Sequence, residues 1–300
     1  MTNTETTVQP SADIPTLSQE KPRESRVQKK LKEWRKKNGR ERESDESEPE
    51  EELEEGVTIL HKLFARKVTL HPGNIVQKCG KRINLGEADA LRVAEEAGIP
   101  VPHVHKVETT PDGKKSIHMD YVPGKTLEEL WPGMSAEQRQ DICQQLRQIL
   151  QTMRSIPPPP DLVGACDGTG IRDTRLYFTY DAPNCHDEAG FNAYLLSSVF
   201  KDSPPAIHEA FAKALRTGHR IVFTHCDLAP RNIMVQDGKI TGLLDWEDGG
   251  WYPEYWEYVK FFYRSGSGDR GWRSYANTIF PQTYPDELVS YIAIARWQSP

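Results

Sequence analysis

Four short β-type runs, in which apolar residues such as Val and Ile stand among polar ones, lie between residues 66 and 122. Residues 66–70 and 74–79 flank His-Pro-Gly, and residues 101–108 and 115–122 flank a segment that contains Pro-Asp-Gly. Short runs of this kind predict strands, and Pro, Gly and Asp between two runs predict a tight turn. The pattern therefore predicts two β-hairpins.

Elsewhere the apolar positions follow the spacing of helices. Residues 85–97 form the first predicted helix, and Gly98 follows it as a stop signal. Ser135 and Gln138 predict a capping box for a long second helix, which the prolines at 157–160 end. The remaining predicted elements are a loop at 161–187, helices at 188–200 and 205–217, and a strand at 221–224.

This order of elements predicts an α+β protein with two lobes. A small sheet-plus-helix lobe is expected over residues 56–122, and a larger, mainly helical lobe over residues 123–300. Residues 1–55 are different, because they are basic over 26–42, acidic over 41–55 and poor in large apolar side chains. Such a segment buries too little apolar surface to offset its ordering entropy, so a disordered charged tail is expected. A nuclear-import signal in the basic part is an alternative.

The composition narrows the class of protein. A formal net charge of −6 argues against a nucleic-acid-binding protein. No apolar stretch suits a signal peptide or a membrane span. The five cysteines form no Cys-x-x-Cys pair, which is typical of a reducing compartment. We therefore expect a cytoplasmic monomer that binds neither nucleic acid nor membrane.

The strongest chemical signal is the segment 225–232, which reads His-Cys-Asp-Leu-Ala-Pro-Arg-Asn and is followed by Asp245. Between them, Asp-Gly at 237–238 predicts a two-residue turn that pairs Gln236 with Lys239 and Asn232 with Leu243. Asp245 should then emerge beside Asn232. A carboxylate and a carboxamide are suitable ligands for Mg²⁺, and Asp227 could accept a proton from a hydroxyl group.

With this layout the sequence resembles the aminoglycoside-phosphotransferase family, notably its fungal members. That family shares the protein-kinase-like fold. The resemblance covers roughly residues 60–265 and implies phosphoryl transfer from ATP with Mg²⁺. It implies Asp227 as the catalytic base, and Asn232 and Asp245 as metal ligands. Two departures are Cys226, where the family has Gly, and Asp-Trp-Glu at 245–247, where protein kinases have Asp-Phe-Gly.

The resemblance also implies a nucleotide site in the first lobe. Lys78, in a predicted strand, and Glu87, in the first turn of the first helix, match the family's phosphate-binding Lys–Glu pair. The end of the second hairpin matches the hinge strand whose backbone would hold adenine, at Met119, Asp120, Tyr121 and Val122. No Gly-x-Gly-x-x-Gly covers the phosphates, since residues 57–76 contain only Gly73.

Several alternatives stay open from the sequence. A protein Ser/Thr kinase lacks support because the Gly-rich loop and Ala-Pro-Glu are missing. A non-catalytic pseudokinase would not need all five of the residues named for catalysis, metal and phosphate. The aromatic residues at 246–263 read as helix packing, with a cation–π cage as the alternative. The acceptor is expected to be a small, cationic hydroxyl compound, facing carboxylates at Asp181, Asp187, Glu188, Glu247 and Asp248.

Overall fold

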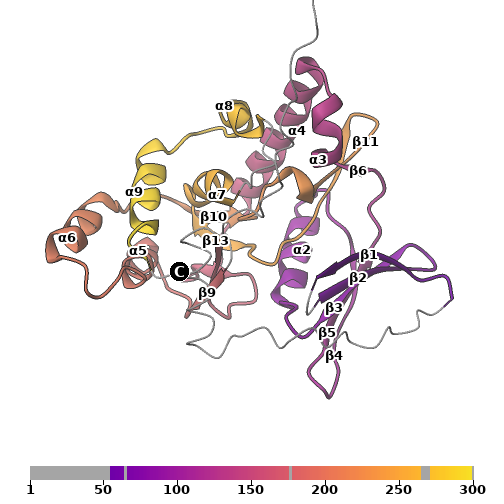
Figure 1. Ribbon diagram of the computed structural model, residues 1–300, viewed down its shortest axis with the longest axis horizontal. Helices are drawn as coiled ribbons and strands as arrows, with labels where there is room; N and C mark the ends of the chain where they lie inside the picture. Colours follow the sequence, from indigo (N-terminus) through magenta and orange to yellow (C-terminus); the bar gives the residue numbers. More distant parts are fainter. Residues whose placement is uncertain (1–54, 64–65, 176–177, 265–270, 299–300) are drawn as a thin grey trace, which may run out of the picture. The chain divides into compact units, whose positions relative to one another are not determined.

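The computed structural model describes residues 55–63, 66–175, 178–264 and 271–298 (Figure 1). These residues belong to one compact unit. The predicted charged tail, apart from Glu55, lies outside them.

A five-stranded antiparallel sheet begins the described chain, with strand order β1-β2-β3-β5-β4. Its strands are β1 (Thr58–Leu63), β2 (Arg66–His71), β3 (Ile75–Gly80), β4 (Val104–Thr109) and β5 (Lys115–Asp120). Both predicted hairpins are confirmed as β2–β3 and β4–β5. Strand β1 was not predicted, and it makes β1–β2 a third hairpin at the edge of the sheet. The turn at Gly73 therefore joins β2 and β3, which form the second hairpin along the chain.

Helix α2 (Gly86–Glu96) follows β3 and lies alongside the sheet in Figure 1. It confirms the helix predicted at 85–97, and its apolar face, which includes Ala90, Leu91 and Ala94, is buried. Glu87 in its first turn is only 2% exposed. A carboxylate is rarely buried without a cation, so this position indicates an ion pair.

The rest of the described chain is mainly helical (Figure 1). Helix α4 has the predicted capping box, because Ser135 accepts from the N–H of Gln138, whose side chain accepts from the N–H of Ser135. The helices are α3 (Leu127–Leu130), α4 (Ala136–Ser155), α5 (Glu188–Ser197), α6 (Pro205–Ala214), α7 (Trp256–Arg264), α8 (Ala276–Ile279) and α9 (Pro285–Ala295).

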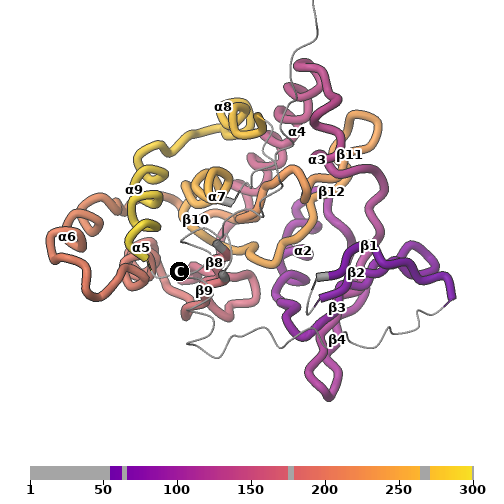
Figure 2. Tube along the Cα trace, in the orientation of Figure 1, coloured from indigo at the N-terminus to yellow at the C-terminus, as the bar shows by residue number. Residues whose placement is uncertain are grey.

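Three small antiparallel sheets lie among these helices. Their strands are β6 (Lys125–Thr126), β7 (Gly164–Ala165), β8 (Ile171–Arg175), β9 (Phe178–Ala182), β10 (Ile221–Thr224), β11 (Ile233–Gln236), β12 (Lys239–Leu243) and β13 (Gly250–Pro253). Figure 2 traces the hairpin from β11 into β12. The loop predicted at 161–187 is wrong in part, because β7, β8 and β9 lie within it. The β8–β9 hairpin depends on a buried ion pair between Asp173 and Lys260, which local sequence does not reveal.

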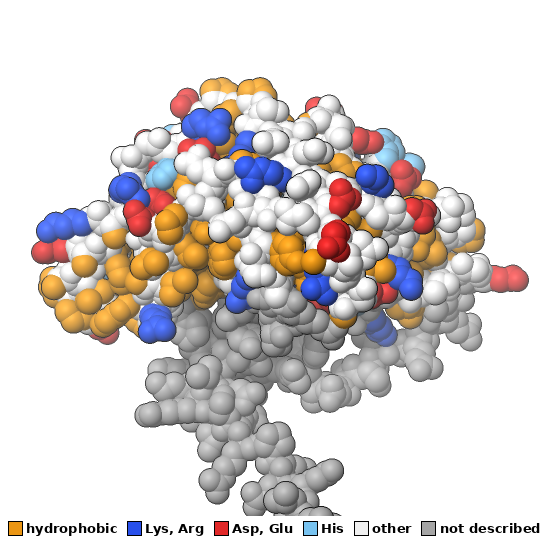
Figure 3. Space-filling model, turned by 90° about the horizontal axis from the view of Figure 1, so that it is seen from above, with side chains coloured by type: hydrophobic (Ala, Val, Ile, Leu, Met, Phe, Trp, Pro, Cys, Tyr) orange, Lys and Arg blue, Asp and Glu red, His pale blue; other side chains and the backbone are white. Residues whose placement is uncertain are grey.

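One large apolar core joins the sheet, α2, α4 and α7. A few large apolar side chains are exposed instead, among them Phe200, Val289, Ile292 and Trp297, which lie on or next to α5 and α9. Figure 3 shows hydrophobic side chains gathered toward the end of the molecule at which α6 lies. None of the helices in the described ranges is both long and apolar enough to cross a membrane.

Candidate active site

Strand β10 leads into the loop 225–232, whose backbone is fixed by a buried carboxylate. Glu257 of α7, 2% exposed, accepts hydrogen bonds from the N–H groups of His225 and Cys226. Cys226 has a φ of 67°, a conformation that favours glycine. The strain at Cys226 is therefore offset by the two hydrogen bonds that hold this backbone to α7.

The His225 ring connects this loop to the residue before Asp245. Its Nδ1 accepts from the N–H of Asp227 at 3.1 Å, and its Nε2 donates to the carbonyl of Leu244 at 2.9 Å. One nitrogen accepts and the other donates, so these bonds select the neutral ring with its proton on Nε2. His225 thus links the loop that carries Asp227 to the segment that carries Asp245.

The Asp227 carboxylate is held by two side chains of its own loop. Arg231 Nη2 lies 2.8 and 2.6 Å from the two carboxylate oxygens, and Asn232 Nδ2 donates to one of them at 3.0 Å. Asp227 is 2% exposed, whereas the Arg231 side chain is 40% exposed. Asp227 is therefore a buried carboxylate held by two side chains, one of which, Arg231, is partly exposed.

The β11–β12 hairpin brings Asp245 next to Asn232, although not in the predicted register. Gln236 pairs with Lys239 as predicted, but a β-bulge after Met234 sets Ile233, not Asn232, opposite Leu243. The N–H of Leu244 then donates to the carbonyl of Asn232 at 2.8 Å. One extra residue in a strand produces such a shift, and no local sequence signal announces it.

Lys78 joins the first sheet to this hairpin. Its Nζ lies 2.6 and 2.9 Å from the two oxygens of Glu87 and 2.8 Å from Oδ1 of Asp245. Burial alone would lower the pKa of Lys78, but the carboxylates of Asp245 and Glu87 raise it well above its ordinary value. Burial acts to raise the pKa of Glu87. Because Nζ contacts both of its oxygens, we treat this pair as ionised.

The residues predicted as metal ligands offer hard oxygen atoms. Asn232 donates through its amide nitrogen to Asp227, so its amide oxygen is the atom that could face a cation. Asp245, with a φ of 65°, contributes a carboxylate. The described residues contain no cluster of three or more His, Cys, Asp or Glu side chains suited to a metal. An amide oxygen and a carboxylate are hard oxygen donors that fit Mg²⁺, which binds through one or two protein groups and takes its other ligands from water and phosphate.

The predicted hinge lies at the end of β5. Met119 is buried, and the N–H groups of Asp120 and Tyr121 donate to the carbonyls of His103 and Asn74. Two N–H groups of the predicted hinge are thus already hydrogen-bonded to backbone carbonyls. After the predicted hinge, Gly124 has a φ of 117°, and a Cβ there would lie 2.5 Å from the carbonyl oxygen of Val235.

The segment after Asp245 is packed into the protein. Trp246 stacks on Phe223 with ring centroids 5.3 Å apart, and Trp251, Tyr252 and Trp256 are also buried. These rings form core, as the packing interpretation predicted, and do not line a surface cage.

The carboxylates predicted to face a cationic acceptor mostly have internal partners. Glu247 contacts Arg66, and Asp248 contacts Arg172 at 3.0 Å. Asp187 caps α5. Glu188 accepts from the N–H groups of Gly218 and His219. Asp181, with a side chain 71% exposed, pairs only loosely with Arg172 at 3.7 Å. The acidic wall is therefore largely structural.

The sequence did not predict four residues that lie near the site: Arg66, Arg172, Arg231 and Glu257. Arg231 stands within the motif, four residues after Asp227, and this spacing was a usable signal. Glu257 lies in a stretch rich in aromatic residues, where a charged side chain indicates a buried partner. Arg66 lies in β2 and Arg172 in β8, and the sequence did not indicate that either strand borders the site.

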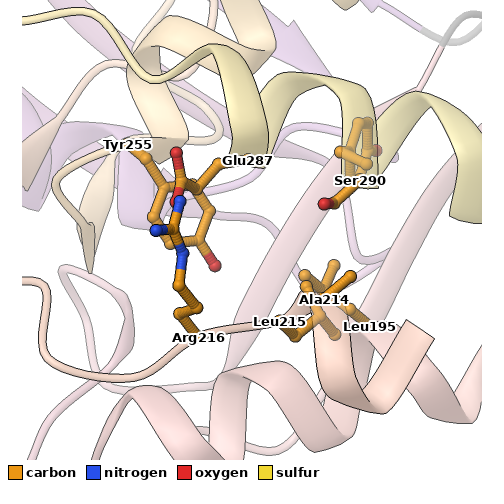
Figure 4. A pocket seen from close by; sticks show the side chains of 8 residues that line it. Leu195, Ala214, Leu215, Arg216, Tyr255, Glu287 and Ser290 are labelled. Carbon is orange, nitrogen blue, oxygen red and sulfur yellow. The ribbon is translucent and has the colours of Figure 1, made fainter. Parts of the chain in front are cut away.

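A separate recess lies between α5, α6 and α9 (Figure 4). Leu195, Leu215 and Tyr255 line it, and Arg216 at its edge pairs with Glu287. It shares no residue with the network around Asp227 and Lys78.

Comparison with known proteins identifies related sequences. The model of the phosphotransferase enzyme family APH matches residues 84–283. An aminoglycoside 3'-phosphotransferase from Enterococcus faecalis is 26% identical over 186 residues, which is 62% of this chain and 66% of that protein. One from Staphylococcus aureus matches with the same identity and coverage. The matched stretch thus spans just under two thirds of these relatives.

Solved structures show the same fold at lower identity. A thermostable mutant of aminoglycoside phosphotransferase APH(4)-Ia, in its apo form, has a TM-score of 0.56 at 13% identity, covering 79% of this chain and 83% of that chain. A ternary complex of a mutant of that enzyme with ADP and hygromycin B has a TM-score of 0.53 at 12% identity, with the same coverage. The predicted α+β, protein-kinase-like fold is therefore confirmed.

Proposed function

Because the chain belongs to the phosphotransferase enzyme family, we propose that it transfers the γ-phosphoryl group of ATP to a hydroxyl group of a small molecule. One observation supports this most strongly. The five residues named from the sequence lie in one connected set of contacts, in which Glu87 and Asp245 hold Lys78, and Asn232 holds Asp227. The backbone bond from Leu244 to Asn232 joins the two halves.

Asp227 acts on the acceptor. Its carboxylate is fixed by Arg231 and Asn232, so it can orient an incoming hydroxyl group and accept the proton that leaves it. Phosphoryl transfer needs little covalent chemistry from a protein, and positioning with charge neutralisation provides most of the acceleration. A carboxylate with a fixed orientation meets the first of these needs.

Lys78 acts on the nucleotide. Its ammonium group, kept charged by Glu87 and Asp245, would contact ATP phosphates, while the backbone near Val122 would hold the adenine. Asn232 and Asp245 would hold Mg²⁺, which when bound neutralises phosphate charge. The Asp245 carboxylate would thus contact both Lys78 and the metal.

The acceptor class follows from the relatives only in outline. Both curated relatives are aminoglycoside 3'-phosphotransferases, so aminoglycosides are the first acceptors to test, followed by amino alcohols and sugars. The internal pairing of Glu247, Asp248 and Glu188 removes the support for recognition of a cation by these acids. All five cysteines are unpaired, and we propose a monomer acting in the reducing cytoplasm.

The test is acceptor-dependent release of ADP by the purified chain with Mg-ATP. Asp227→Asn should lower the rate about 10²- to 10⁴-fold, the usual contribution of a general base. Asp237→Asn is the matched control, because this carboxylate lies in the exposed β11–β12 turn at a φ of 50°, which Asn tolerates. An Asp227→Asn enzyme with the activity of the control would refute the assignment.

A further inference from the structure

The β1–β2 hairpin places an arginine, Arg66, beside Glu247. Leu63 pairs with Arg66, and the two residues between them are Phe64 and Ala65, so the connection contains no glycine. Protein kinases cover the phosphates at this hairpin with the backbone N–H groups of a Gly-rich loop. The connection in this chain therefore lacks the glycines of that loop.

Strand register places Arg66 on the same face of the sheet as Lys78. Val68 pairs directly with Lys78 across β2 and β3. Side chains two residues apart on a strand share a face. Arg66 therefore lies on the same face as Lys78, two residues nearer than Val68 to the connection between β1 and β2. Lys67 lies on the opposite face.

Contacts agree with this placement. Arg66 Nη1 lies 3.2 Å from Oε2 of Glu247, two residues after Asp245. Burial opposes the charge of Arg66, but the carboxylates of Glu247, Asp245 and Glu87 together raise its pKa. The Arg66 guanidinium thus contacts Glu247, two residues along the chain from the Asp245 carboxylate that contacts Lys78.

The ion pair with Glu247 can be exchanged without leaving a lone buried charge. The Arg66 side chain is 30% exposed, whereas Glu247 is 12% exposed and has a second cation, Arg172, at 3.7 Å. Glu247 would keep Arg172 if Arg66 turned toward a phosphate. Guanidinium suits this exchange, because its planar fork binds phosphate oxygens in pairs.

A triphosphate also needs more positive charge than Lys78 supplies, since two carboxylates already share that ammonium group. We propose that Arg66 binds the β- and γ-phosphates of the nucleotide, in place of the N–H groups of a Gly-rich loop. This inference rests on the proposed function. The competing explanation is that Arg66 serves only as an ion-pair partner of Glu247.

The experiment is calorimetric measurement of adenosine, ADP and ATP binding, with Mg²⁺, to the full chain and three variants. Arg66→Met keeps the apolar stem and removes the charge, Lys67→Met is the matched control, and Glu247→Gln removes the ion pair while keeping Arg66. We expect Arg66→Met to bind ATP about 10- to 100-fold more weakly, as for loss of a charged hydrogen bond, with adenosine affinity unchanged. Lys67→Met should bind all three ligands as the unmodified chain does.

Glu247→Gln separates the two explanations. If Arg66 binds phosphate, Glu247→Gln keeps or raises ATP affinity, whereas an ion-pair role requires it to copy Arg66→Met. Equal losses for adenosine and ATP in Arg66→Met, or no loss for either, would overturn the inference while leaving the proposed function standing. An unmodified chain that binds no ATP would overturn both. Melting temperatures check that each variant is folded.

Discussion

At the scale of residues, the orientation of Asp227 depends on a neighbour four positions along the same loop. Arg231 contacts both oxygens of the carboxylate, and Asn232 contacts one. Arg231 is a positioning residue in this account, because its described contacts are with Asp227 and not with the Lys78 cluster. Its loss should therefore affect the chemical step more than ATP binding.

We predict that Arg231→Met lowers kcat about tenfold or more, because a misplaced general base loses much of its effect. The KM for ATP should change little, and Arg231→Lys should restore part of kcat. Steady-state kinetics with Lys239→Met as the exposed control measures this. An unchanged kcat with a raised KM for ATP would instead assign Arg231 to the nucleotide.

Glu257 gives a second prediction, in pH dependence. Burial raises the pKa of Glu257 to about 7, although the N–H groups of His225 and Cys226 favour its ionised form. The unfolded chain ionises this group near its ordinary value of 4.5. Between these values the folded state binds the extra proton, so the contribution of Glu257 to stability falls as pH rises from about 5 to 8.

Glu257→Gln should remove this slope, which amounts to about 3 kcal/mol at most. Urea unfolding of both proteins at pH 5, 6, 7 and 8 measures the difference. The stability gap between the chain and the variant should shift in favour of the variant as pH rises. A gap that is constant with pH would contradict a protonated Glu257 in the fold.

At the scale of elements, the β8–β9 hairpin depends on an ion pair with a distant helix. Lys260 of α7 lies 2.7 Å from Asp173 Oδ1, and both side chains are fully buried. Lys260 also donates to the carbonyl of Thr174. Removing one partner of a buried pair leaves an uncompensated charge, which is strongly unfavourable.

We predict that Lys260→Met destabilises the protein by about 3–5 kcal/mol. The double variant Asp173→Asn with Lys260→Met should recover part of this loss, because no lone charge remains. Denaturant unfolding measures both. Arg216→Met, which removes the ion pairs of the 58% exposed Arg216 side chain with Asp286 and Glu287, should have little effect. A Lys260→Met protein as stable as the Arg216→Met control would contradict the role of this pair.

This hairpin also shows why part of the fold escaped prediction. Helix α4 and the β11–β12 turn were predictable because Ser135, Gln138 and the Asp-Gly turn act locally. Asp173 of β8 is buried against Lys260, which lies 87 residues away in the sequence. A charged strand without alternation therefore reads as a loop. The bulge after Met234 is equally invisible, since it reflects packing rather than composition.

At the scale of the whole molecule, the first sheet and the loops around Asp227 meet through charged side chains. Lys78 reaches Asp245, and Arg66 reaches Glu247. The sequence predicted Lys78, Glu87, Asp227, Asn232 and Asp245 because each stands in a motif with fixed spacing. Arg66 and Arg172 have no such motif, and their place near the site follows only from the tertiary arrangement.

Substitution of Asp245 tests this arrangement, because Asp245 contacts Lys78 and is also proposed to bind Mg²⁺. Asp245→Asn should weaken ATP binding in the presence of Mg²⁺, and removal of Mg²⁺ by EDTA should then cause little further loss. In the unmodified chain, EDTA should weaken ATP binding clearly. Calorimetry with and without EDTA measures both. Equal sensitivity to EDTA in the two proteins would remove Asp245 from the metal site.

Phosphorylation of a small molecule through Asp227 can be measured by mass spectrometry of the acceptor. The purified chain is incubated with Mg-ATP and a panel of aminoglycosides, amino alcohols and sugars. At least one compound should gain a single phosphoryl group. Asp237→Asn should form the same product, whereas Asp227→Asn should form almost none. Phosphorylation of added protein substrates with no modified small molecule, or equal product from Asp227→Asn, would contradict the proposed function.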